Sequence, residues 1–221
     1  MKPAPPVTQM MEAMDQPLSA GGLERLEPLT RGFYQRPTVE VARELLGRLL
    51  LRRTPEGLAA LRLTEVEAYL GVEDAACHTF GGRRTERTAT MWGEAGHAYV
   101  YLIYGMHHCL NVVTVGDGHP EAVLVRGGVA VAGEELMLRR RGGRRRSLAD
   151  GPGKLCQALA ITRDDDGADL CTPESGLWIV DDGLRVAEGE VLRTPRVGVD
   201  YAGEAAAWPL RFVWSRYAGG R

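Results

Sequence analysis

The chain has 221 residues, of which 44% are hydrophobic and 25% charged, the ordinary composition of a globular protein. It contains no run of 18 apolar residues, and its first thirty residues lack the basic start and apolar centre of a secretory signal. We therefore expect a cytoplasmic protein without a membrane span. The four cysteines have no CxxC or zinc-finger spacing, so the sequence predicts reduced thiols, no bound metal and no cofactor.

Charge is distributed unevenly along the chain, although the net charge is only −2. Residues 78–154 hold 11 Lys and Arg against 7 Asp and Glu, and both flanking thirds are acidic. The basic third also contains Trp92, Tyr99, Tyr101 and Tyr104. Positive charge interleaved with aromatic side chains is typical of surfaces that bind nucleic acids. The arginine run at 139–146, taken alone, is more typical of a solvated loop that contributes general electrostatics.

The first third of the chain predicts a tail, a helix and a hairpin. Residues 1–30 are rich in Pro, Met and Gln without a period, so we expect a mobile tail and a single domain over residues 31–221. The pattern from Thr38 to Leu46 predicts a helix that ends at Gly47. Strands are predicted at residues 48–53 and 58–69, joined by a TPEG turn.

The end of the second predicted strand combines apolar residues with two carboxylates. Side chains on an extended strand alternate, which places on one face Leu61, Leu63, Glu65, Glu67 and Tyr69. Neighbouring carboxylates disfavour each other's ionisation, and burial raises their pKa further, which suits a general acid or base. A pair of solvated glutamates on the outer face of a sheet explains the segment equally well.

The rest of the chain predicts a long loop, a second hairpin and a valine-rich strand. Residues 71–96 have no sustained period and read as an irregular, functional loop. The strand at 98–104 reverses at Gly105 into a strand that contains Asn111, which places Tyr104 near the hairpin tip. Arg126 interrupts the strand at 121–131, and a buried arginine implies a buried anion. Short helices are expected at 133–140 and 152–161, and strands at 177–180, 189–199 and 210–214.

Three long motifs carry a resemblance to a known family. They are TEVEAYLGVEDAACH at 64–78, AYVYLIYGMHHCLNVV at 98–113 and GPGKLCQALAI at 151–161. With these motifs the chain resembles the alkyladenine (3-methyladenine) DNA glycosylases, over residues 36–213. It departs from the family at His107 and His108, where aromatic residues are usual, and in residues 118–122, which are two residues longer.

The resemblance implies a fold and a catalytic centre. Together with the predicted elements it favours an α+β domain on a curved, mainly antiparallel, open-barrel-like sheet, with short peripheral helices and a protruding β-hairpin. Glu67 corresponds to the general base, which activates the water that attacks the sugar of an extruded nucleotide. Arg126 corresponds to an arginine that helps to hold this water, together with a backbone carbonyl from residues 196–199.

The resemblance also implies how the damaged base is held. Tyr69, His78 and Tyr101 correspond to aromatic walls that stack on the extruded base. Asn111 corresponds to an amide that screens against the 2-amino group of guanine, and Tyr104 to the side chain that fills the gap left in the duplex.

The expected partner is double-stranded DNA with damaged purines, bound by a monomer. Arg83, Arg84 and Lys154 are candidates for contacts with the DNA backbone, Lys154 at a helix N-terminus. Since Lys2 and Lys154 are the chain's two lysines, we expect a monofunctional enzyme that uses water rather than an amine. The alternatives are a non-catalytic module that binds damaged DNA and, less compatible with the basic aromatic segment, a small-molecule hydrolase that uses the glutamate pair.

Overall fold

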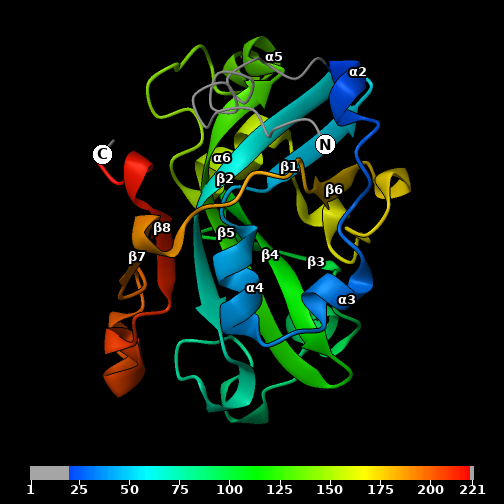
Figure 1. Cartoon of the computed structure of the whole chain (residues 1–221). Coiled ribbons are helices and arrows are strands. Elements are labelled where there is room, and N and C mark those ends of the chain that lie inside the picture. Colours follow the sequence, from blue (N-terminus) through cyan, green and yellow to red (C-terminus); the bar gives the residue numbers. More distant parts are fainter. Residues whose placement is uncertain (1–19, 220–221) are drawn as a thin grey trace, which may run out of the picture.

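Antiparallel strands dominate the structure, a computed structural model that describes residues 20–219. Figure 1 shows the strands as long arrows with short helices around them. The strands are β1 (Leu49–Thr54), β2 (Gly57–Tyr69), β3 (Ala98–Ile103), β4 (His107–Gly116), β5 (His119–Ala132), β6 (Leu177–Val180), β7 (Val191–Thr194) and β8 (Arg211–Trp214). The α-helices are α2 (Ala20–Leu23), α3 (Arg31–Tyr34), α4 (Thr38–Leu45), α5 (Glu134–Arg140) and α6 (Pro152–Leu159).

The long strand β2 is the centre of the sheet. The main strand order is β3-β4-β5-β2-β1-β6, and every pair is antiparallel. One edge of β2 pairs with β5, whereas the other pairs first with β1 and then, from Glu65 to Glu67, with β8. The sheet does not close, since β3 and β6 end the main order. The predicted α+β fold with an open, mainly antiparallel sheet is confirmed.

An irregularity in β2 changes which side chains share a face. The pairing with β5 shifts register between Leu63 and Glu65 and again between Glu65 and Val66. As a result Leu61, Leu63, Val66 and Ala68 all lie in the main hydrophobic core. Strict alternation would place Leu63 and Val66 on opposite faces. The prediction that Leu61 and Leu63 share a face with the glutamates is therefore wrong, because it assumed a regular strand.

The main core lies between the sheet and helices α4, α5 and α6. Residues of β3, β4 and β5 alternate between this core and the opposite face. Those in the core include Val100, Leu110, Val112, Val123 and Val125. Those on the opposite face include Tyr99, Tyr101, Cys109, Asn111 and Leu124, and they line a pocket. Period-2 alternation thus separates a packed face from a polar and aromatic one.

Two segments differ from the prediction. Within the expected tail, residues 1–19 lie outside the described part of the chain, but Leu23 of α2 is fully buried and the Leu29 N–H donates to the Ile179 carbonyl. Of the strand expected at 189–199, only Val191–Thr194 forms a strand, β7. Pro195 follows, and it has no N–H to continue the ladder. Among residues 20–219 there is no helix long and apolar enough to cross a membrane.

Candidate active site

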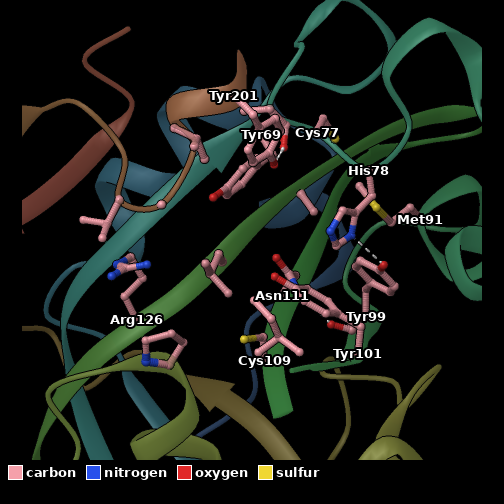
Figure 2. Close-up of a pocket in the computed structure, with 18 of the residues that line it drawn as sticks. Tyr69, Cys77, His78, Met91, Tyr99, Tyr101, Cys109, Asn111, Arg126 and Tyr201 are labelled. Atoms are coloured by element: carbon pink, nitrogen blue, oxygen red, sulfur yellow. Dashed lines mark hydrogen bonds between the residues drawn. The ribbon is translucent and has the colours of Figure 1, made fainter. Parts of the chain in front are cut away.

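A pocket of about 290 Å³ opens on the polar face of the sheet. Its lining contains five aromatic side chains from three parts of the chain: Tyr69, Tyr99, Tyr101, Tyr104 and Tyr201. His78, Asn111 and Arg126 add polar groups. Figure 2 shows Arg126 on the side of the pocket opposite His78, Tyr99 and Tyr101. Apolar walls with a few placed polar groups are typical of sites for small planar ligands.

Glu67 lies directly behind the surface of this pocket. Its side chain is 0% exposed, and three donors surround the carboxylate. The Tyr69 hydroxyl donates to Oε2 at 2.9 Å, and Arg126 Nη1 donates to the same oxygen at 3.3 Å. The Val197 N–H donates to Oε1 at 2.8 Å. Tyr69, Arg126 and Val197 all line the pocket, so the groups that bind Glu67 separate its carboxylate from the cavity.

Arg126 is the cation that the two glutamates of β2 share. Its Nε donates to Glu65 Oε1 at 2.9 Å and lies 3.3 Å from Glu67 Oε1. Arg211 of β8 also donates to Glu65 Oε1, at 2.7 Å. The buried anion inferred from Arg126 is therefore a pair of carboxylates. Glu65, held between two arginines, is suited to orienting Arg126 rather than to proton transfer.

Burial raises the pKa of Glu67 above its ordinary value, while Arg126, the Val197 N–H and the Tyr69 hydroxyl act in the opposite direction. The net effect is a carboxyl group whose pKa lies closer to neutrality than that of an exposed glutamate. This is the direction that a general base requires, because a more basic carboxylate accepts a proton more readily.

The aromatic residues form a connected wall opposite Arg126. The His78 and Tyr101 rings are 4.6 Å apart between centroids in an edge-to-face arrangement, and His78 Nδ1 lies 2.9 Å from the Tyr99 hydroxyl. Burial, followed by the nearby Arg87 and Arg83, lowers the pKa of His78 to about 4. His78 is therefore neutral near pH 7 and adds no positive charge to the wall.

Asn111 lies at the base of this wall, on β4. It is buried, and its Nδ2 donates to the Tyr99 carbonyl at 3.1 Å. This bond fixes the orientation of the amide in the pocket lining. A fixed amide can reject ligands by leaving one of their polar groups without a partner.

Tyr104 stands at the tip of the β3–β4 hairpin, as the sequence predicts. Its side chain is 84% exposed, although it also borders the pocket. Its φ of 53° and the φ of 69° at Gly105 give the two positive values of a tight hairpin turn. Met106, which follows, is 69% exposed. The hairpin tip thus presents two large side chains to solvent.

The predicted basic contacts fall into two groups. Arg83 and Arg84 are exposed in the loop that begins near His78, and the Arg84 guanidinium lies 5.5 Å from the Trp92 ring centre. Arg87, in the same loop, lies 5.0 Å from the Tyr101 ring centre. Lys154 differs, because its Nζ pairs with Asp150 Oδ1 at 2.8 Å, which reduces its charge toward an outside phosphate.

Several arginines of the run at 139–146 have structural partners. Arg140 bonds to Glu56 and to Thr54, and Arg141 is buried and bonds to the Leu148 carbonyl. Arg145 pairs with Glu134 and Glu135. Arg140, Arg141 and Arg145 therefore have intramolecular roles, and a general electrostatic role of the run stays a prediction.

Sequence reasoning missed three residues near the site. Tyr201, 71% exposed, lines the pocket and donates its hydroxyl to the Ala76 carbonyl at 3.3 Å. Arg196 and Asp74 form a buried ion pair behind Tyr69. For Asp74 the available signal was an aspartate in the loop that follows a predicted strand, whereas Arg196 was expected within the strand at 189–199. From residues 196–199, the group that contacts Glu67 is the Val197 N–H, which the sequence did not predict, and the water-binding carbonyl of this segment stays a prediction.

The fold and the pocket define a candidate hydrolytic site, in which a buried carboxylate lies behind a pocket lined by aromatic side chains. Comparisons with known proteins give the family. The sequence model of the methylpurine-DNA glycosylase family matches residues 32–218, and the chain belongs to this family. Its members are hydrolases that act on the N-glycosidic bond in DNA repair, and DNA is their partner.

Similar proteins cover most of the chain. One from Methanocella arvoryzae is 53% identical over 83% of this chain and 90% of its own length. Another from Bdellovibrio bacteriovorus is 49% identical over 83% of this chain and 93% of its own length. Both are named, provisionally, 3-methyladenine DNA glycosylases. The predicted resemblance is confirmed.

Proposed function

We propose that this protein is a monofunctional DNA glycosylase that hydrolyses the N-glycosidic bond of alkylated or deaminated purines and leaves an abasic site. The observation that carries this proposal is the position of Glu67. Its carboxylate is fully buried, yet each of its three donors lines a pocket walled by aromatic side chains. This arrangement supports a role for Glu67 as general base toward a base extruded into the pocket.

Extrusion of the base is the first task of such an enzyme. A base within a duplex exposes its glycosidic bond poorly, and unstacking costs a few kcal/mol, least at damaged pairs. Tyr104, exposed at the hairpin tip, is suited to enter the gap left in the duplex and so offset this cost. Stacking of the extruded base on Tyr69, Tyr101 and His78 would add about 1 to 3 kcal/mol.

Hydrolysis then requires an activated water. Glu67 would accept a proton from a water held between Arg126 and the backbone at Val197. The water oxygen forms a bond to C1′ as the bond from C1′ to the purine nitrogen breaks, and the base departs with the electron pair. Positive charge that develops on the sugar is stabilised by the carboxylate. Arg126 opposes the effect of burial on the pKa of Glu67 and helps to keep it ionised.

Selection among bases follows from charge and from Asn111. Purines that carry a positive charge after alkylation gain a cation–π interaction with tyrosine rings, worth up to about 2 kcal/mol when desolvated. The neutral His78 does not repel them. Asn111, whose Nδ2 donates to the Tyr99 carbonyl, would oppose the 2-amino group of normal guanine.

The proposed reaction uses water rather than an enzyme amine. Lys154, the lysine within the described residues, is paired with Asp150 and belongs to α6 rather than to the floor of the pocket. The protein would act as a monomer on double-stranded DNA in the cytoplasm, with Arg83 and Arg84 against the phosphates. Phosphate contacts of this kind predict binding that weakens steeply with salt.

The test is incubation with duplex DNA that contains hypoxanthine or ethenoadenine, or with methylated DNA, followed by detection of the free base. Release of the base with an intact strand supports the proposal. Trapping of a covalent DNA adduct by borohydride would contradict the water mechanism. Binding without any release, equal in wild type and Glu67→Gln, would favour a non-catalytic module that recognises damaged DNA.

A further inference from the structure

Behind the pocket, Arg196 and Asp74 form an ion pair with both side chains 0% exposed. Arg196 Nη2 donates to Asp74 Oδ1 at 2.8 Å, and Nη1 donates to the other carboxylate oxygen. Two charges removed from water carry a large desolvation cost, which is offset only if their remaining hydrogen bonds are also made. The other partners of the two side chains therefore indicate what the pair does.

Asp74 holds the loop that follows β2. Its Oδ2 accepts the Leu70 N–H at 3.0 Å, and its Oδ1 accepts the Ala76 N–H at 3.0 Å. These bonds fix the chain from the end of β2 to Ala76, two residues before His78. One carboxylate thus sets the path of the loop that carries one aromatic wall of the pocket.

Arg196 holds the elements on both sides of Glu67. It donates to the Ala68 carbonyl at 3.0 Å and to the Ala205 carbonyl at 3.1 Å. Its guanidinium lies 4.7 Å from the centre of the Tyr69 ring. The next residue in the chain, Val197, donates its N–H to Glu67. The position of Arg196 therefore determines where both Tyr69 and the Val197 N–H meet the carboxylate.

We propose that Arg196 and Asp74 are positioning residues of the glycosylase reaction, which hold Tyr69 and the Val197 N–H against Glu67. This inference rests on the proposed function. Neither side chain is part of the pocket lining described above, so both act through other residues. The fixed fork of the guanidinium is essential, because it serves two carboxylate oxygens and two carbonyls at once and also covers an aromatic ring.

A second, partly buried ion pair offers a control. Arg62 donates to both carboxylate oxygens of Asp182, at 3.2 and 2.7 Å, and also to the Gly47 carbonyl. The two side chains are 12% and 11% exposed. This pair joins β2 to the segment after β6 and lies outside the pocket. If the role of Arg196 were purely structural, Arg196→Lys and Arg62→Lys would give the same rate and the same pH profile, and would differ only in thermal stability.

The experiment compares single-turnover release of hypoxanthine from duplex DNA by wild type, Arg196→Lys, Asp74→Asn and Arg62→Lys, each across a range of pH. The lysine in Arg196→Lys keeps the positive charge but lacks the planar guanidinium with its several N–H donors. We expect Arg196→Lys to lower the rate about 10-fold or more, as the loss of hydrogen bonds to charged groups does, while Arg62→Lys stays close to wild type. Asp74→Asn, which keeps the shape of the side chain, should fall between them.

The pH profile gives a readout that stability alone does not move. Glu67 faces Tyr69, Arg126 and Glu65 as well as the Val197 N–H. A displaced N–H no longer favours the carboxylate, so the acid limb of the Arg196→Lys profile should move to higher pH by roughly half a unit to one unit. The limb of the Arg62→Lys profile should not move.

The outcomes separate this inference from the function on which it rests. An active wild type with a slowed Arg196→Lys and a displaced acid limb supports the positioning role. If the wild type is active and Arg196→Lys and Arg62→Lys give the same rate and the same position of the acid limb, the positioning role is overturned. The proposed function is then left intact. A wild type that releases no base overturns both.

Discussion

The Tyr69 hydroxyl donates a hydrogen bond to Glu67 Oε2 at 2.9 Å, from two residues further along the same strand. One tyrosine thus contributes its ring to the pocket and its hydroxyl to the proposed base. The two contributions can be separated by Tyr69→Phe, which keeps the ring. We expect the variant to bind lesion-containing duplex as wild type does, but to show an acid limb displaced to higher pH, because the carboxylate loses a donor. A changed affinity for the lesion-containing duplex, together with an unchanged pH profile, would contradict this account.

The raised pKa of Glu67 also predicts how stability depends on pH. Since the folded-state pKa is above the unfolded value, folded Glu67 retains its proton where the unfolded chain has lost it. The contribution of Glu67 to stability is fully present below the pKa that it has in the unfolded chain. It is lost as the pH rises through the pKa that it has in the folded protein. Relative to wild type, Glu67→Gln should therefore gain in Tm as the pH increases from about 4 to 8. Calorimetry of both proteins checks this, and a constant difference in Tm would contradict it.

Tyr104 and Met106 allow the wedge to be tested against a neighbour. Both are exposed at the hairpin tip, 84% and 69% respectively, so neither change should alter Tm appreciably. We expect Tyr104→Ala to weaken discrimination between lesion-containing and undamaged duplex, with a smaller effect on the most labile alkylated bases. Met106→Ala serves as the control. Equal effects of the two variants on duplex selectivity would mean that Tyr104 is not the wedge.

Asn111→Ala tests the source of selectivity. The variant removes the amide held by the Tyr99 carbonyl, and the lost hydrogen bond should cost about 1 kcal/mol of stability. The release of normal guanine relative to hypoxanthine should rise, because the group that opposes the 2-amino substituent is gone. The ratio of the two bases released from matched duplexes measures this. An unchanged ratio would assign Asn111 to a structural role between β3 and β4.

Most of the architecture could be predicted because it depends on local patterns. The helix at Thr38, both hairpins and the tip at Tyr104 follow from periodicity, proline and glycine in nearby residues. The register shift in β2 could not be predicted in this way. It depends on pairing with β5, where a Cβ on Gly128 would lie 2.9 Å from the Arg62 carbonyl oxygen. Close backbone approach of this kind is a property of the two strands together.

The candidate site was predictable to a different extent. The aromatic residues and the glutamates occur in motifs long enough to be recognised. The aromatic residues line one pocket, and Glu67 lies behind its surface. Asp74 and Arg196 are separated by more than a hundred residues, and only the packing of two loops brings them together. The sequence pattern at Lys154 predicts a phosphate contact at a helix N-terminus, but it does not predict the pairing of Lys154 with Asp150, four residues earlier. Charged residues in loops acquire their partners from tertiary structure.

The central claim, that Glu67 is the general base, is tested most directly by single-turnover release of hypoxanthine from duplex DNA by wild type and Glu67→Gln. General-base catalysis typically contributes about 100-fold to 10,000-fold, so we expect Glu67→Gln to lose at least that lower factor while its affinity for the lesion duplex remains close to that of wild type. Release of the base by Glu67→Gln at the wild-type rate would contradict the account.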